Sequence, residues 1–165
     1  MKRIISILME NESGALSRVV GLFSQRGYNI DTLTVAPTDD DTLSRLTLTT
    51  NGDDQMAEQI VKQLHKLIDT IKVVDLTEGP HIERELMLVK IKASDIDSRT
   101  ELKNCVEIFR GSIIDVTPAT YTVQLAGDSE KLDAFIEAVS QIGIMEVSRS
   151  GVTGISRGDK FIRVN

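Results

Sequence analysis

Two short polar segments near the N-terminus carry the residue types that recognise a small molecule. The first, residues 11–16, reads Asn-Glu-Ser-Gly-Ala-Leu, and the second, residues 27–30, reads Gly-Tyr-Asn-Ile. The first segment follows an apolar run and opens a helical pattern, so its backbone N–H groups lie at a helix N-terminus, where a carboxylate is stabilised. These residue types favour recognition of a ligand rather than catalysis.

An α-amino acid needs donors for its carboxylate, acceptors for its ammonium group and an apolar wall for its side chain. Backbone N–H groups in the first helical turn supply the donors, and the helix dipole adds about 0.3 to 1 kcal/mol. Asparagine amides offer oxygen to an ammonium or nitrogen to a carboxylate. The predicted ligand-binding residues are Asn11, Gly14, Ala15, Leu16, Asn29 and Ile30, with Leu33 and Val35 as further apolar wall.

The same residues also have a purely structural interpretation. Ser13 is a common helix cap, Gly14 a common turn residue, and Asn29 a residue type that ends helices. A single Asn-x-x-Gly loop would therefore carry little weight. The second asparagine, at the start of the next strand, favours the ligand site, because we expect the fold to bring the two loops side by side at one end of the sheet.

Hydrophobic periodicity predicts the elements that position these loops. A continuous apolar run indicates a buried strand, recurrence every three to four residues indicates a helix, and alternation indicates a half-buried strand. The first half then reads as a strand over 4–9, a helix over about 14–26, a hairpin of 30–35 and 46–49, a helix capped by Asp53 or Asp54, and a strand over 71–76.

The same order returns after Gly79-Pro80. Its elements are a strand over 86–91, a helix over about 97–109, strands over 112–116 and 121–125, a helix capped by Asp128 or Ser129, and a strand over 144–147. The predicted fold class is α+β, with two tandem ferredoxin-like βαββαβ domains at residues 1–78 and 79–165. The glycine-containing residues 150–158 lack the ending of a phosphate loop, so we expect a flexible tail there.

Composition excludes several classes of protein. The chain has 165 residues, of which 41% are hydrophobic and 27% charged, and its net charge is −6, which indicates a globular protein without a basic nucleic-acid surface. No apolar stretch approaches the roughly 20 residues of a membrane span. Domains of about 75 to 85 residues form small cores, and an open sheet face needs cover, so we expect dimerisation.

Neither metal chemistry nor thiol chemistry is indicated. His65 and His81 are far apart in the sequence and form no ligand set, and residues 39–41 look like a solvated turn of three aspartates. The single cysteine, Cys105, lies in an apolar helical pattern without a nearby histidine and is predicted to be a buried structural thiol. One cysteine makes no intrachain disulfide, which fits a reducing cytoplasm.

The first half resembles an ACT domain, an amino-acid-sensing module, through its Asn11-x-x-Gly14 loop and its Asn29-Ile30 pair. Ser13 stands where many such loops carry proline. The whole chain resembles the regulatory small subunits of acetohydroxyacid synthase, also called acetolactate synthase. The runs that carry this likeness are 11–19, 23–30, 33–38, 84–90, 107–111, 114–118 and 149–151.

The resemblance implies a non-catalytic, cytoplasmic protein that activates a large thiamine-diphosphate enzyme and makes it sensitive to valine. It implies a homodimer formed through the ACT domains, with the effector between two chains, so that Asn11 and Gly14 of one chain face Asn29 and Ile30 of the other. Thiamine diphosphate, Mg and FAD are expected on the large catalytic subunit and no cofactor on this chain. Nucleic acid and membrane are not expected as partners.

Two other classes of function compete with this interpretation. One is an amino-acid-responsive ACT regulator of a different enzyme or of transcription, although acidic charge and the lack of a helix-turn-helix pattern disfavour DNA binding. The other is a small ferredoxin-like enzyme such as an acylphosphatase-like hydrolase. That activity requires a phosphate loop, which Tyr28-Asn29 does not have beside it.

Overall fold

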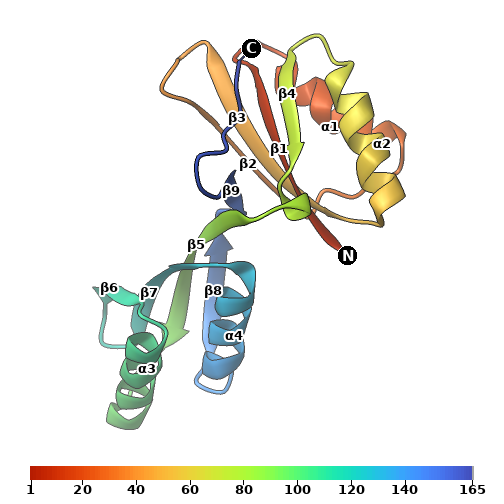
Figure 1. Ribbon diagram of the computed structural model, residues 1–165. Coiled ribbons are helices and arrows are strands. Elements are labelled where there is room, and N and C mark those ends of the chain that lie inside the picture. The colour runs from red at the N-terminus through yellow and green to blue at the C-terminus, as the bar shows by residue number, and fades with distance from the viewer. Residues whose placement is uncertain (165) are drawn as a thin grey trace. The chain divides into compact units, whose positions relative to one another are not determined.

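The computed structural model describes residues 1–164, which form two compact units (Figure 1). One unit contains residues 1–83 and 151–164, and the other contains residues 84–150. The elements are β1 (Lys2–Glu10), α1 (Ala15–Gln25), β2 (Thr32–Pro37), β3 (Leu43–Asn51), α2 (Asp54–His65), β4 (Thr70–Asp75), η1 (Leu76–Glu78), β5 (His81–Lys92), α3 (Ile96–Ile108), β6 (Ser112–Val116), β7 (Thr120–Gly127), α4 (Ser129–Val139), β8 (Ile144–Arg149) and β9 (Thr153–Ser156).

The first unit has the predicted βαββαβ order. Its antiparallel sheet has the strand order β2-β3-β1-β4, and α1 and α2 cover one face of it, as Figure 1 shows. Alternate residues of the strands enter the core on this face, where they meet the apolar stripes of the helices. The buried side chains of this core are Ile5, Ile7, Met9, Ala15, Val19, Phe23, Leu46, Leu48, Ile60, Leu64 and Val73.

The second unit repeats the arrangement. Its strands follow the order β6-β7-β5-β8, all antiparallel, and its helices are α3 and α4. The buried core residues are Met87, Val89, Ile91, Ala93, Leu102, Val106, Val123, Leu125, Leu132, Phe135 and Val139. The predicted fold class, two tandem ferredoxin-like domains, is therefore confirmed.

The helix starts follow the predicted capping logic, and the structure selects between the alternatives. Asp53 caps α2 by accepting a hydrogen bond from the N–H of Met56 at 2.8 Å. Asp128 caps α4 in the same way, accepting from the N–H of Lys131 at 2.9 Å. A cap of this kind satisfies an N–H group that has no partner within the helix.

The C-terminal segment differs from the predicted flexible tail. Residues 151–156 belong to the first unit, where Val152 is 1% exposed and packs with Ile4 and Leu76 on the helix-free face of the sheet. β9 pairs with β5, and the Gly154 carbonyl accepts a hydrogen bond from Arg45 at 2.9 Å. In the structure, the first boundary between the units lies after residue 83, and the C-terminal segment belongs to the first unit. The sequence instead predicted a single boundary after residue 78.

Candidate functional site

The loop between β1 and α1 is anchored to the β2–β3 hairpin. Asn11 donates its backbone N–H to the Thr42 carbonyl at 2.8 Å and its side-chain Nδ2 to the Asp41 carbonyl at 2.9 Å. Both bonds use nitrogen atoms, so the amide oxygen of Asn11 is the atom that faces a potential donor. This arrangement suits an ammonium group better than a carboxylate at this residue.

The N-terminus of α1 offers fewer N–H donors than the sequence predicted. Gly14 is the N-cap, with φ 86, and no side chain caps this helix. The N–H of Ala15 already donates to the Glu12 carbonyl at 3.2 Å, and the Ala15 side chain is 3% exposed and lies in the core. The donors left for a ligand carboxylate are therefore those of Gly14 and Leu16.

A cation that the sequence analysis missed lies beside this loop. A Cβ built on Gly14 would lie 3.3 Å from one terminal guanidinium nitrogen of Arg18. Arg18 is held in place by Asp69, whose Oδ2 accepts from Nε at 2.6 Å, and this hydrogen bond together with the charge of Asp69 raises the pKa of Arg18. The four-residue spacing of Gly14 and Arg18 on a helix was the available signal.

Asn29 and Ile30 precede β2 and hold different contacts. The Asn29 carbonyl accepts a hydrogen bond from the Thr50 hydroxyl at 2.6 Å, and its Nδ2 donates to Asp31 Oδ1 at 2.7 Å. Ile30 is half-buried and packs against the first core. The Asn29 side chain itself is exposed, so its amide oxygen faces solvent.

The structure does not bring the two predicted loops together within one chain. Asn11 lies against Thr42 and Asn29 against Thr50, at opposite ends of β3, which corresponds to about 25 Å at the rise of an extended strand. The expectation that the loops lie side by side was wrong for a single chain. β1 and β2 run parallel, so the loop after one and the loop before the other fall at opposite ends of the sheet.

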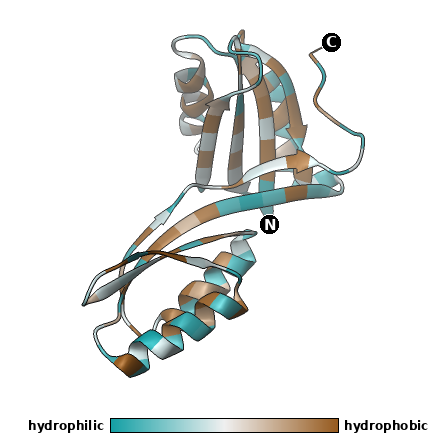
Figure 2. Cartoon of the chain, turned by 90° about the vertical axis from the view of Figure 1, so that its left-hand side faces the viewer, coloured by the Kyte–Doolittle hydropathy of each residue, from teal (hydrophilic) through white to brown (hydrophobic). Residues whose placement is uncertain are grey.

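The outer edge of the first sheet presents apolar side chains at which another chain could complete the site. β2 is one of the two edge strands of this sheet, and its Val35 is 38% exposed. Leu16 and Val20 of α1 are 38% and 41% exposed. Figure 2 shows hydrophobic and hydrophilic residues alternating along the strands of the chain. An unprotected edge strand readily pairs with a further strand.

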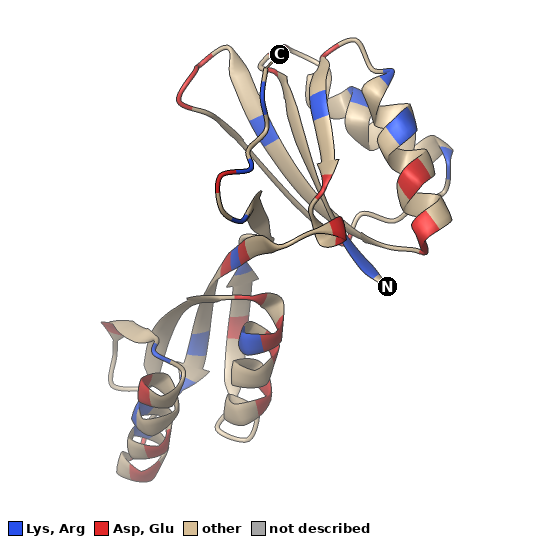
Figure 3. Ribbon diagram, in the orientation of Figure 1, with Lys and Arg blue, Asp and Glu red and all other residues tan. Residues whose placement is uncertain are grey.

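Other chemistry has little support in the described part of the chain. Among residues 1–164, no group of three or more His, Cys, Asp or Glu side chains is placed to hold a metal ion, and no helix is long and apolar enough to cross a membrane. His65 is exposed, as expected, and Cys105 is only half-buried. Figure 3 shows acidic residues at the tip of the β2–β3 hairpin and both signs of charge along the helices.

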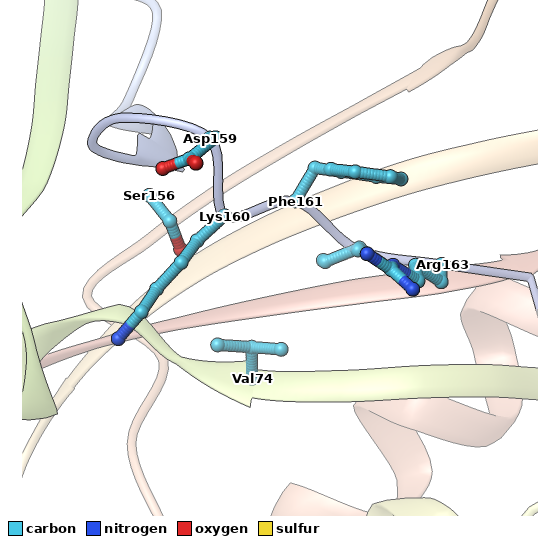
Figure 4. A pocket seen from close by; sticks show the side chains of 7 residues that line it. Val74, Ser156, Asp159, Lys160, Phe161 and Arg163 are labelled. Atoms are coloured by element: carbon cyan, nitrogen blue, oxygen red, sulfur yellow. The ribbon is translucent and has the colours of Figure 1, made fainter.

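A separate cavity of about 450 Å³ lies between β4 and the C-terminal segment (Figure 4). Val74 forms one wall, and Asp159, Lys160 and Arg163 bring charges of both signs to the other. The Arg163 guanidinium lies 5.0 Å from the ring centre of Phe161, which is 68% exposed. The mixed charges of this open cavity define no single class of ligand.

The first unit has the βαββαβ order, with Gly14 at the N-cap of α1. Residues 5–72 match a family model described as the AHAS small subunit-like ACT domain, so the first unit is an ACT domain. Residues 84–158 match a second model, described as the small subunit of acetolactate synthase. Together the two models account for most of both units.

Relatives of known name extend this likeness over the whole chain. The acetolactate synthase isozyme 3 small subunit of Escherichia coli is 65% identical over 164 residues, which cover 99% of this chain and 100% of the relative. The acetolactate synthase small subunit of Haemophilus influenzae is 59% identical over 98% of this chain and 99% of the relative. The crystal structure of the small subunit from Thermotoga maritima matches with a TM-score of 0.86 at 35% identity, with 97% and 99% covered. The chain belongs to the acetolactate synthase small subunits.

Proposed function

We propose that this chain is the non-catalytic regulatory subunit of an acetolactate synthase. In this role it activates the thiamine-diphosphate-dependent large subunit and makes it sensitive to feedback inhibition by valine in branched-chain amino acid synthesis. The observation that carries the proposal is end-to-end identity of 65% with a protein named as such a small subunit. Thiamine diphosphate, Mg and FAD belong to the catalytic partner, and the complex works in the cytoplasm.

The valine site is composed of two chains. The separation of Asn11 from Asn29 within one chain supports this, because only a second copy can place both residues on one ligand. The exposed apolar side chains of β2 and α1 offer the surface for such a copy. In the dimer, Asn11, Gly14 and Leu16 of one chain meet the carboxylate and ammonium groups, and Asn29 and Ile30 of the other close the site.

Valine acts by linkage between two arrangements of the dimer. Valine binds one arrangement more tightly, and the catalytic subunit binds the other more tightly. Bound valine therefore lowers the population of dimers that activate the catalytic subunit. A coupling free energy of about 1 to 3 kcal/mol is typical of such systems and is sufficient for strong inhibition. The inhibitor needs no contact with the active site.

Reconstitution tests the proposal. The purified chain is added to the large subunit of the same source, and acetolactate formation is measured with and without valine. The proposal expects the rate to rise when the chain is added and to fall again with valine, whereas alanine leaves it unchanged. A rate that the chain does not alter would contradict the regulatory role and favour an ACT regulator of another enzyme.

Asn29→Ala is expected to weaken valine binding by about 1 to 3 kcal/mol, because a buried polar group of the ligand loses its hydrogen-bond partner. Titration calorimetry with valine measures the change. Asn51→Ala is the matched control, because Asn51 also donates to Asp31, to Oδ2 at 2.7 Å, while it lies outside the predicted site. Equal valine affinities in the Asn29→Ala and wild-type chains would mean that Asn29 has only a structural role in the connection between α1 and β2.

A further inference from the structure

Arg45 carries a charge that the first unit does not balance. It lies on β3 opposite Ala36 of β2 and Leu8 of β1, on the helix-free face of the sheet. One terminal nitrogen donates to the Gly154 carbonyl at 2.9 Å, but Nε is buried without a hydrogen-bond partner. Burial lowers the pKa of Arg45, because desolvation disfavours the charged guanidinium.

No carboxylate compensates this charge within the described residues 1–164, since none of their ion pairs within 4.0 Å involves Arg45. A second polar atom on the same face is also unsatisfied. The Ser6 hydroxyl is buried without a partner and lies on β1 opposite Thr47. A buried polar group without a hydrogen-bond partner costs free energy, so natural structures rarely contain one.

Arg45 lines a cavity of about 260 Å³ beneath the C-terminal segment. The other polar side chains of the cavity are threonines: Thr34, Thr38, Thr47 and Thr153. Thr153 belongs to β9, so one wall is built by the segment that crosses the sheet. The Thr38 hydroxyl already donates to the Asp40 carbonyl at 3.0 Å, so it is not available to a ligand. A guanidinium and threonine hydroxyl groups that line one cavity suit an oxyanion, because the planar fork of arginine matches carboxylate and phosphate oxygens.

We propose that this cavity binds a small oxyanion, a carboxylate or a phosphate group, with Arg45 as its cationic ligand and Thr47 and Thr153 as hydroxyl donors. Its volume lies below the range of about 300 to 1,000 Å³ common for larger ligands, which favours a small anion. The site is distinct from the loop at Gly14, because Arg45 faces away from the helices. A bound anion bridges β3 and β9 and ties the C-terminal segment to the sheet.

Titration calorimetry of the full chain tests this site with two probes, inorganic phosphate and acetate. Ionic strength is held constant with chloride, and the probe that gives saturable heat identifies the source of the oxyanion. Arg45→Gln is expected to weaken that binding by about tenfold to a hundredfold, the range of a lost charge-assisted hydrogen bond. Arg157→Gln is the matched control, because Arg157 is exposed in the same unit and lies outside the cavity, so its affinity stays unchanged.

Arg45→Gln also alters the contact to Gly154, so a second variant guards against loss of the fold. Thr153→Val removes one hydroxyl from an exposed position, and we expect several-fold weaker binding with an unchanged melting temperature. Absence of saturable binding of both probes into the millimolar range overturns the proposal. An effect of Arg45→Gln on self-association alone, measured by sedimentation, also overturns it, because the partner of Arg45 would then be a second chain.

Discussion

Gly14→Asp is expected to abolish valine inhibition of the reconstituted enzyme while activation by the chain persists. The new carboxylate occupies the position of the ligand carboxylate at the N-terminus of α1, and like charges at close range cost several kcal/mol. It also lies beside Arg18, whose guanidinium is 3.3 Å from the built Cβ, and forms an ion pair in place of the ligand. Acetolactate formation against valine concentration measures the effect.

Backbone strain needs its own control in this experiment. Gly14 has φ 86, and a residue with a Cβ pays roughly 1 to 2 kcal/mol in the left-handed region, less for Asp. Gly158→Asp adds the same charge at φ 71, where nothing lies within 4 Å of a built Cβ. We expect that control to retain full valine inhibition. Unchanged inhibition in Gly14→Asp would remove the loop from the site.

Arg3→Met is expected to lower the stability of the first unit by about 3 to 5 kcal/mol, the usual effect of removing one partner from a buried ion pair. The Arg3 side chain is 4% exposed and pairs with the carboxylate of Asp75, whose side chain is 2% exposed, at 3.6 Å. It also pairs with the exposed Asp54. Without Arg3, the Asp75 carboxylate keeps only its hydrogen bonds to Thr77 in a buried position.

Hydrogen exchange locates this effect, since it reports on each unit separately. Amides of β1 and β4 should exchange much faster in Arg3→Met, whereas β5 and β7 keep their protection, because the second unit has its own ion pair between the buried Glu85 and Arg149. Adding Asp75→Asn removes the uncompensated charge and should restore part of the protection. Equal exchange in the Arg3→Met and wild-type chains would show that Arg3 contributes nothing to the first unit.

Local signals in the sequence predicted the helices and strands, but they did not predict which segment covers the helix-free face of the first sheet. The apolar run at Ile4 to Met9 indicated a buried strand, either covered by helices or buried on both faces, and in the structure both faces of this strand are buried. The pattern does not say which chain provides the cover. We expected a second copy, whereas Val152 of the same chain packs on Ile4. Contacts between residues 4 and 152 depend on the path of the whole chain, which periodicity does not encode.

The position of the candidate site was likewise predicted only in part. The Asn11 and Gly14 loop was predicted from residue types typical of a helix start, and the structure has Gly14 at that start with a left-handed backbone. Its role in binding a ligand stays a prediction. β1 and β2 are parallel, as the strand–helix–strand order implies, so Asn29 lies at the opposite end of the sheet from Asn11 and not beside it as predicted. Arg45 gave no signal, because its burial comes from β9, more than a hundred residues away.

The most direct test of the two-chain valine site is a valine titration of an equimolar mixture of the Gly14→Asp and Asn29→Ala chains after exchange of protomers. Each parent alone has both sites impaired, but a mixed dimer combines the intact Asn11–Gly14 loop of one chain with the intact Asn29 of the other. In a two-fold dimer the account predicts recovery of about a quarter of the wild-type sites, at wild-type affinity. A mixture that binds valine no better than its parents, beside a wild-type chain that binds it, would contradict a site shared between two chains.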